Sequence, residues 1–188
     1  AGDFGEAVLD VVAETLGTWA NPDQRFADHE TPTPREPSAY LIDRPGSVQA
    51  DIRWGWYTID RSDPRWADLQ LAGNAIGGAY LSRLNRVLRE EKGFTYGASL
   101  VSAPMRHGGY TYAQGSFRNE VVGDALALMP SLVDTATHPI TDEEVTRARD
   151  YLTGVTALRY ATAAGVCHGV LSLVAVGLTT DFVDAQLE

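Results

Sequence analysis

The stretch "LNRVLREEKGFTYGASL" (residues 84–100) predicts a helix, a stop and a strand in direct succession. Gly93 stands where a residue in the left-handed conformation commonly ends a helix. Residues 94–101 then favour a strand by their β-prone side chains. On the helix side, apolar residues recur at the spacing of one helical face: Leu81, Leu84, Val87 and Leu88. We also expect Arg86 and Glu90 to pair across one helical turn.

Arg89 and Tyr96 lie on opposite sides of this break in the pattern. In the ordinary interpretation, Arg89 complements the dipole at the helix end, and Tyr96 packs beside Ala98 and Leu100 on one strand face. In the functional interpretation, the helix end and the strand bring a guanidinium and a phenol to one place. Together they would offer fixed donors to a carbonyl oxygen, or to the oxyanion that it becomes. The residues by themselves leave both interpretations open.

Upstream of this stretch the apolar period changes from that of a strand to that of a helix. "SVQADIRWGWYT" (residues 47–58) predicts a half-buried antiparallel strand, because apolar and polar residues alternate along it. Its apolar face consists of Val48, Ala50, Ile52, Trp54 and Trp56. Asp63 and Pro64 then begin a helix that Gly77 and Gly78 end. Its inner stripe consists of Trp66, Leu69, Ala72, Ala75 and Ile76.

Downstream the pattern predicts one more strand and a series of helices. The strand covers residues 109–117, and helices follow at 120–136, 142–163, 166–176 and from Asp181. Thr141 and Glu144 form a capping box at the start of the long helix. The apolar run at residues 169–178 predicts a buried helix. Paired strands with long helices after them indicate an α+β fold, an antiparallel sheet with helices packed on one face.

The chain divides into three parts by composition. Residues 1–20 form an amphipathic helix, with Asp3 as the expected N-cap. Residues 21–37 carry four prolines and many charges, which predicts a Pro-rich linker. Residues 38–188 form the α+β domain. We expect this domain to be truncated at its C-terminus, because the chain stops just as a helix begins.

Composition excludes several classes of function. A chain of 188 residues with a net charge of −10 suits one acidic domain and argues against a nucleic-acid partner, which needs a basic face. No apolar run approaches the roughly 20 residues of a membrane span. No signal peptide is visible, which slightly favours a soluble, cytoplasmic protein. The single cysteine, Cys167, excludes an internal disulfide and a thiolate metal cluster.

Sequence motifs of a self-contained enzyme are absent. No phosphate-binding G-x-x-x-x-G-K-[ST] occurs, and Gly97-Ala98-Ser99 lacks the second glycine of a nucleophile elbow. His107-Gly108-Gly109 has no nucleophile to serve and is interpreted as a turn. The chain alone is therefore not expected to be an enzyme.

The histidines do not predict a metal site either. They are His29, His107, His138 and His168, and no two of them fall within one helical turn. Cys167 and His168 are adjacent, so on a helix their side chains point about 100° apart. We expect His168 to lie in a core or groove, and His29 in a solvated loop. No metal ligand is predicted in this chain.

The segment "AIGGAYLSRLNRVLREEKGFTYGASL" (residues 75–100) resembles the second, non-catalytic half of the insulinase/pitrilysin-type zinc metallopeptidases and their mitochondrial-processing-peptidase relatives. The matching residues are Gly77-Gly78, Ser82-Arg83-Leu84, Leu88-Arg89-Glu90, Gly93 and Tyr96. "RPGSVQADIRWG" (residues 44–55) is similar to the strand that opens this half. "PITDEEVTRARDYLTG" (residues 139–154) is similar to a helix start of the family, with Glu144 and Ala148 in the expected places.

This resemblance implies a fold, a partner and a role for two residues. In proteins of this family, each half is a roll of antiparallel sheet backed by helices, and the two halves enclose a chamber for extended peptides. The zinc site, an inverted H-x-x-E-H helix, belongs to the first half, so zinc is expected in the partner half and no cofactor in this chain. Arg89 and Tyr96 are implied to contact the substrate backbone at that zinc. The complete protein or complex would be a zinc metalloendopeptidase.

Two alternatives stay open beside this hypothesis. The H-x-x-E-H half belongs either to the same polypeptide or to a separate subunit. The chain could also be a non-catalytic scaffold subunit of the same family, without peptidase activity. In either case, apolar surface normally covered by the missing half would be exposed, which predicts a homodimer of the isolated chain.

Overall fold

The computed structural model describes residues 2–23, 30–31, 33 and 35–185, with side chains described to residue 183. The helices are α1 (Ala7–Leu16), α2 (Trp66–Gly73), α3 (Val122–Val133), α4 (Asp142–Arg159), α5 (Ala163–Val174) and α6 (Asp181–Ala185). Two described segments are π-helices, η1 (Asn74–Gly78) and η2 (Asn85–Glu91), and one is a 3₁₀-helix, η3 (Asn119–Val121). The strands are β1 (Gln49–Thr58), β2 (Ala98–Pro104) and β3 (Gly109–Arg118).

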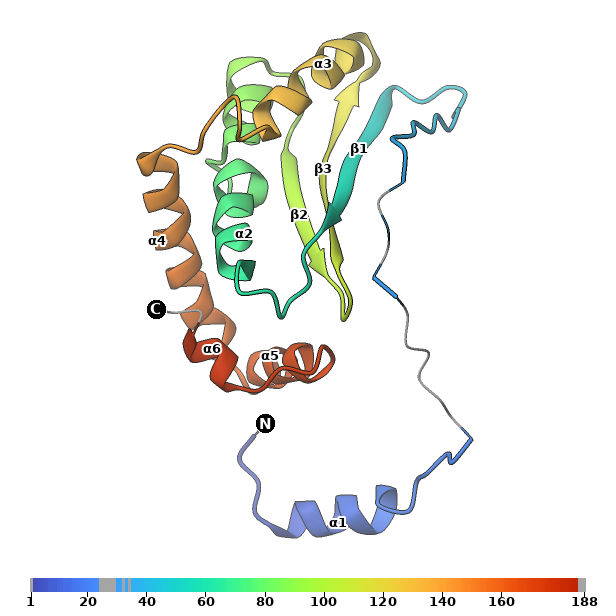
Figure 1. The fold of residues 1–188 in the computed structure, drawn as a ribbon, viewed down its shortest axis with the longest axis vertical. Coiled ribbons are helices and arrows are strands. Elements are labelled where there is room, and N and C mark those ends of the chain that lie inside the picture. Colours follow the sequence, from blue (N-terminus) through green and yellow to red (C-terminus); the bar gives the residue numbers. More distant parts are fainter. Residues whose placement is uncertain (1, 24–29, 32, 34, 186–188) are drawn as a thin grey trace.

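The described strands form one antiparallel sheet in the order β1-β3-β2. Its register aligns Ile52 of β1 and Ala98 of β2 with Gly115 of β3. Figure 1 shows α2 between the sheet and α4, with α3 across one end of the strands. The predicted α+β fold, an antiparallel sheet with helices packed on one face, is confirmed.

The core lies between this face of the sheet and the helices. It consists of Ile52, Ile76, Leu84, Leu88, Ala98, Leu100, Ala113, Phe117, Ala125 and Met129. The helices contact β2 and β3 most closely, so Trp54 and Trp56 of β1 stay more than a third exposed on the same face. Gly77 lets η1 rest directly on β2, because a Cβ there would lie 2.3 Å from the backbone nitrogen of Leu100.

The helix that carries Arg89 is wider than the sequence predicted. η2 is a π-helix, in which each turn takes about one residue more than in an α-helix. Arg86 therefore pairs with Glu91 at 2.6 Å, and the predicted pair with Glu90 is wrong. Gly93 ends the helix at φ +63° as predicted, and the Phe94 N–H closes the turn on the carbonyl oxygen of Leu88 at 2.8 Å.

A buried ion pair joins this region to α4. The Arg83 guanidinium donates to both carboxylate oxygens of Glu144, at 2.9 and 2.7 Å. It also donates to the carbonyl oxygens of His138 and Pro139, at 2.8 and 3.0 Å. Glu144 completes the predicted capping box with Thr141. The hydrogen bonds from Arg83 are the main reason that the pKa of Glu144 is lowered to about 2.

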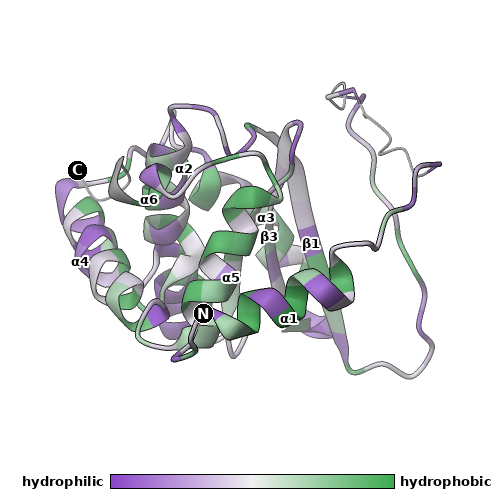
Figure 2. Ribbon diagram, turned by 90° about the horizontal axis from the view of Figure 1, so that it is seen from below, coloured by the Kyte–Doolittle hydropathy of each residue, from purple (hydrophilic) through white to green (hydrophobic). Residues whose placement is uncertain are grey.

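Several local predictions near the chain ends are wrong. α1 begins after Glu6 rather than at an Asp3 cap. α5 is largely exposed rather than buried, and His168 on it is exposed, since only Gly169 and Leu173 of this helix are buried. Figure 2 shows hydrophobic residues, in green, along both α1 and α5. Apolar composition alone did not determine which surface would be covered.

The division of the chain into residues 1–20, 21–37 and 38–188 stays a prediction, and His29 lies outside the described residues.

No single described helix is long and apolar enough to cross a bilayer. α4 and α5, which are bent by 112° relative to each other, pass that test of length and composition only as a pair.

Candidate functional site

A pocket of about 470 Å³ lies where η2 meets the sheet, and both predicted residues line it. Its floor is the face of the sheet opposite the helices. The polar residues of β1 and β3 that line the pocket alternate along their strands with Ile52 and Phe117, which are buried in the core on the helix side. Its lining includes Asp51, Arg53, Tyr80, Asn85, Arg89, Tyr96, Ser99, Gln114 and Ser116. Arg89 and Tyr96 thus line the same pocket, and their functional role stays a prediction.

Arg89 is held at the wall of this pocket with most of its donors available. Its guanidinium carbon lies 4.1 Å from the ring centroid of Tyr80, a cation–π contact that fixes its plane. One nitrogen lies 3.3 Å from the carboxylate of Glu90, an exposed side chain, and such exposed pairs are weak. The side chain is 27% exposed. A guanidinium has five N–H donors, so this arrangement leaves several for a ligand.

Tyr96 projects into solvent from a fixed backbone. It is 92% exposed and lies before β2 begins at Ala98. The Thr95 hydroxyl accepts the N–H of Gly97 at 3.1 Å and donates to the carbonyl oxygen of Ser116 at 2.7 Å. These bonds anchor the turn to β3. The interpretation that Tyr96 packs beside Ala98 and Leu100 is therefore wrong, because those two are buried on the other side of the sheet.

Asn85, which was not among the predicted site residues, links the segments that carry Arg89 and Tyr96. Its Oδ1 accepts the N–H of Ala98 at 2.9 Å, and its Nδ2 donates to the carbonyl oxygen of Ala79 at 3.2 Å. One side chain thus joins the helix that bears Arg89 to the strand start that follows Tyr96. The available signal was its position four residues before Arg89, on the same side of the helix. Tyr80 was also missed, although it lies inside the quoted motif.

The floor of the pocket is polar and carries both donors and acceptors. Ser116 donates from its hydroxyl to Asp51, and Gln114 donates to the hydroxyl of Ser99 at 3.3 Å. Next to them, the Arg53 guanidinium lies 6.0 Å from the ring centroid of Tyr112. Such a surface offers both hydrogen-bond donors and acceptors to a ligand.

Among the described residues, no group of three or more His, Cys, Asp or Glu side chains lies close enough to hold a metal ion. His107 belongs to the turn between β2 and β3, as predicted, where Gly108 has φ +77° and its carbonyl oxygen accepts the Met105 N–H at 3.0 Å. Cys167 is exposed on α5.

Known proteins share both the sequence pattern and the fold. The family model described as "Peptidase M16 inactive domain" matches residues 1–152. An uncharacterised zinc protease of Streptomyces coelicolor is 30% identical over 111 residues, which are 58% of this chain and 24% of that protein.

Solved structures also share the fold, among them the following two. The peptidase M16 inactive domain from Pseudomonas fluorescens superposes with a TM-score of 0.86 at 23% identity, covering 99% of this chain and 45% of that one. A chain of complex III from Candida albicans has a TM-score of 0.63 at 14% identity, over 76% of this chain and 37% of that one. The chain thus spans less than half the length of these relatives.

The family match covers most of the chain and includes the helix, glycine stop and strand that build the pocket. This chain belongs to the Peptidase M16 inactive domain family.

Proposed function

We propose that this chain is the substrate-binding, zinc-free half of a zinc peptidase and that Arg89 and Tyr96 bind the carbonyl oxygen of the peptide bond to be cleaved. The observation that carries the proposal is the shared pocket of these two side chains. Tyr96 supports it further, because a tyrosine that is 92% exposed on an anchored turn has no packing role.

The chemistry of the pair suits a developing oxyanion. A guanidinium and a phenol both donate hydrogen bonds, and the positive charge of Arg89 favours the tetrahedral intermediate over the neutral carbonyl. Asn85 and Tyr80 hold the pair in place before substrate arrives. Such preorganised donors stabilise the transition state without reorganising.

Zinc belongs to the partner half in this proposal. The pocket offers Arg, Tyr, Asn, Gln and Ser side chains and a single carboxylate, Asp51. Zinc in proteins is bound by clusters of His, Cys and carboxylate ligands, so these residues do not fit the metal. An H-x-x-E-H half, in the same polypeptide or in a separate subunit, would supply it, and an extended peptide would lie between the halves.

The test is Arg89→Ala in the complete peptidase. Loss of one oxyanion donor should lower peptide turnover by on the order of tenfold to a thousandfold, while the zinc content stays the same. Arg86→Ala is the matched control, because Arg86 lies on the same helix and forms only an exposed pair with Glu91. Unchanged turnover in Arg89→Ala would refute the oxyanion role.

The second candidate is a scaffold subunit without peptidase activity. The fold likeness to a chain of complex III keeps it open, whereas the joint placement of Arg89 and Tyr96 favours the peptidase. Peptide cleavage by the complete assembly separates the two, because a scaffold would show none in wild type or variant.

The proposal also includes self-association of the isolated chain. α1 has no buried residue and exposes an apolar set: Val8, Leu9, Val11, Val12 and Leu16. Exposed apolar patches of this kind mark surfaces that other chains cover. Light scattering on residues 1–188 should show a mass that rises with concentration, and a strict monomer over that range would contradict it.

A further inference from the structure

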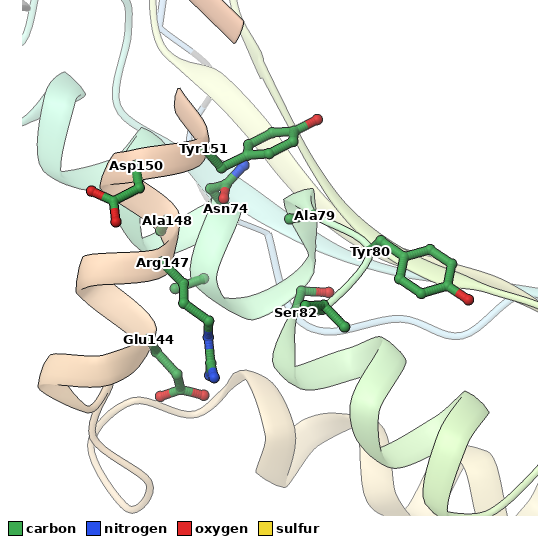
Figure 3. Close-up of a pocket in the computed structure, with 11 residues that line it drawn as sticks. Asn74, Ala79, Tyr80, Ser82, Glu144, Arg147, Ala148, Asp150 and Tyr151 are labelled. Carbon is green, nitrogen blue, oxygen red and sulfur yellow. The ribbon is translucent and has the colours of Figure 1, made fainter. Parts of the chain in front are cut away.

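A second pocket, of about 440 Å³, lies between α4 and the loop that follows η1 (Figure 3). Small side chains form much of its wall, among them Ala75, Ala79 and Ala148. Figure 3 shows Tyr80 and Tyr151 projecting in the same direction from opposite walls, one from the loop and one from α4. Its size is within the usual range for pockets that bind a ligand group.

The wall of this pocket contains an amide without a partner. Asn74 is only 7% exposed, and its buried Oδ1 accepts no hydrogen bond in the described part of the chain. Gly78 keeps the space beside the amide open, because a Cβ there would lie 2.9 Å from Nδ2. A buried acceptor that lacks a partner is costly and rare, so this oxygen is a candidate acceptor for a donor that enters the pocket.

The buried charged group of the pocket is already paired, because Glu144 is held by Arg83 at 2.7 Å. Arg147, which forms an exposed pair with Glu143 at 2.7 Å, and Asp150 both lie at the exposed rim. The interior therefore favours a group that has an apolar body and a neutral hydrogen-bonding tip.

The two pockets meet at Tyr80. This residue lines both of them, and its ring carries the Arg89 guanidinium on the side of the first pocket. A peptide bound at Arg89 and Tyr96 can therefore continue past Tyr80 into the second pocket.

We propose that this second pocket is a side-chain subsite for the same peptide and that it selects tryptophan or tyrosine. The aromatic ring would lie among the alanines between Tyr80 and Tyr151, and the indole N–H or phenol O–H would donate to the amide oxygen of Asn74. Because Oδ1 is fully buried in the structure, the Asn74 side chain has to rotate to present this oxygen to the pocket. This inference rests on the proposed peptide-binding function and names its substrate class.

The test compares synthetic ten-residue peptides that are identical except for one position, which carries Trp, Ala or Lys. Binding to residues 1–188 is measured by fluorescence anisotropy, and kcat/KM in the complete peptidase. The Trp position is moved along the peptide, and at one position Trp should bind about tenfold more tightly than Ala. Equal binding at every position, or a preference for Lys over Trp through Asp150, would overturn the proposal.

Two variants locate the preference. Ala79→Leu narrows the pocket, and Asn74→Leu removes its polar group; each should bring the ratio of Trp-peptide to Ala-peptide affinity close to one. Ala127→Leu, at an exposed position of α3, is the matched control and should keep it. A preference that survives both pocket variants would overturn the subsite.

The subsite and the oxyanion role can fail separately. Arg89→Ala should lower kcat for the Trp and Ala peptides equally, so their ratio is preserved. An unchanged kcat in Arg89→Ala with a ratio that depends on Ala79 would refute the oxyanion role and support the subsite. The reverse result would refute the subsite alone.

Discussion

Arg83 and Arg89 lie on consecutive turns of one segment, yet the fold uses them in opposite ways. Arg83 is 7% exposed, and its donors are taken by Glu144 and by backbone carbonyl oxygens before α4. Arg89 rests on the ring of Tyr80 at the wall of an open pocket, with one weak ion pair. The difference arises from what covers each side chain, because the start of α4 supplies acceptors to Arg83 alone.

The comparison shows that two arginines of one sequence motif can have different environments, one suited to holding the fold together and one accessible to a ligand. Both arginines belong to the pattern that matches the family, and pattern matching cannot tell them apart. A buried guanidinium whose acceptors are all in place holds two elements together. One that stays accessible on a rigid support can bind a ligand.

The largest expected difference between Arg83 and Arg89 is in how much each side chain contributes to the free energy of unfolding. Arg83→Ala leaves the Glu144 carboxylate buried without its partner, and breaking a buried pair in this way costs about 3–5 kcal/mol. Arg89→Ala loses only the cation–π contact with Tyr80 and a weak exposed ion pair, so it should change the free energy of unfolding by about 1 kcal/mol or less. Urea denaturation of the two variants measures the difference. Equal losses would mean that Arg89 also has a structural role.

The second contrast depends on pH. The folded-state pKa of Glu144 is about 2, against 4.5 for the ordinary group. The stability that this carboxylate contributes is therefore fully present above pH 4.5 and is lost as the pH falls toward 2. The loss amounts to about 3 kcal/mol, from roughly 1.4 kcal/mol for each unit of the pKa difference.

Glu144→Gln should remove that part of the pH dependence. The variant is less stable near pH 6, and the difference from wild type should shrink as the pH is lowered to about 2. Urea denaturation at several pH values measures it. A difference that stays constant with pH would show that the Arg83–Glu144 pair does not set the pKa.

A smaller effect should follow from Asn85→Ala. The variant leaves the Ala98 N–H without its acceptor and should cost about 1–2 kcal/mol. It should also lower turnover in the complete peptidase, because Arg89 and Tyr96 are no longer held together. Asn85→Asp keeps an acceptor for Ala98 and should retain more activity. Equal turnover in wild type and Asn85→Ala would contradict the positioning role.

The smallest expected effect concerns the support of Arg89. Tyr80→Leu removes a cation–π contact worth about 0.5–1 kcal/mol, which predicts a two- to fivefold loss of turnover. Tyr80→Phe keeps the ring and should behave like wild type. Thermal unfolding should be nearly unchanged in both. A loss of turnover in Tyr80→Phe would assign the role to the hydroxyl instead.

Much of the fold was predictable because its signals are local. The alternation along β1, the glycine stop at Gly93 and the capping box of Thr141 and Glu144 depend on a few neighbouring residues. Each signal limits the backbone angles of its own segment. The position of the candidate site followed from the same motif, since it joins a helix end to a strand.

Other features could not be predicted from neighbouring residues. The sequence predicted a buried α5 and an Arg86–Glu90 pair, whereas α5 is mostly exposed and Arg86 contacts Glu91. Asn85 was missed because its partners, Ala79 and Ala98, lie in different segments. A side chain's environment depends on which elements pack around it, and that is a property of the assembled chain.

The amino-acid sequence by itself determined the order of helices and strands, the stop at Gly93 and the presence of Arg89 and Tyr96 on either side of it. Only the tertiary structure decided that Arg83 is buried and Arg89 accessible, and that Tyr96 faces solvent beside a polar floor. The physical reason is the separation along the chain over which each property is determined. Periodicity and backbone conformation are set within a few residues, whereas burial and hydrogen-bond partners are set by segments far apart in the chain.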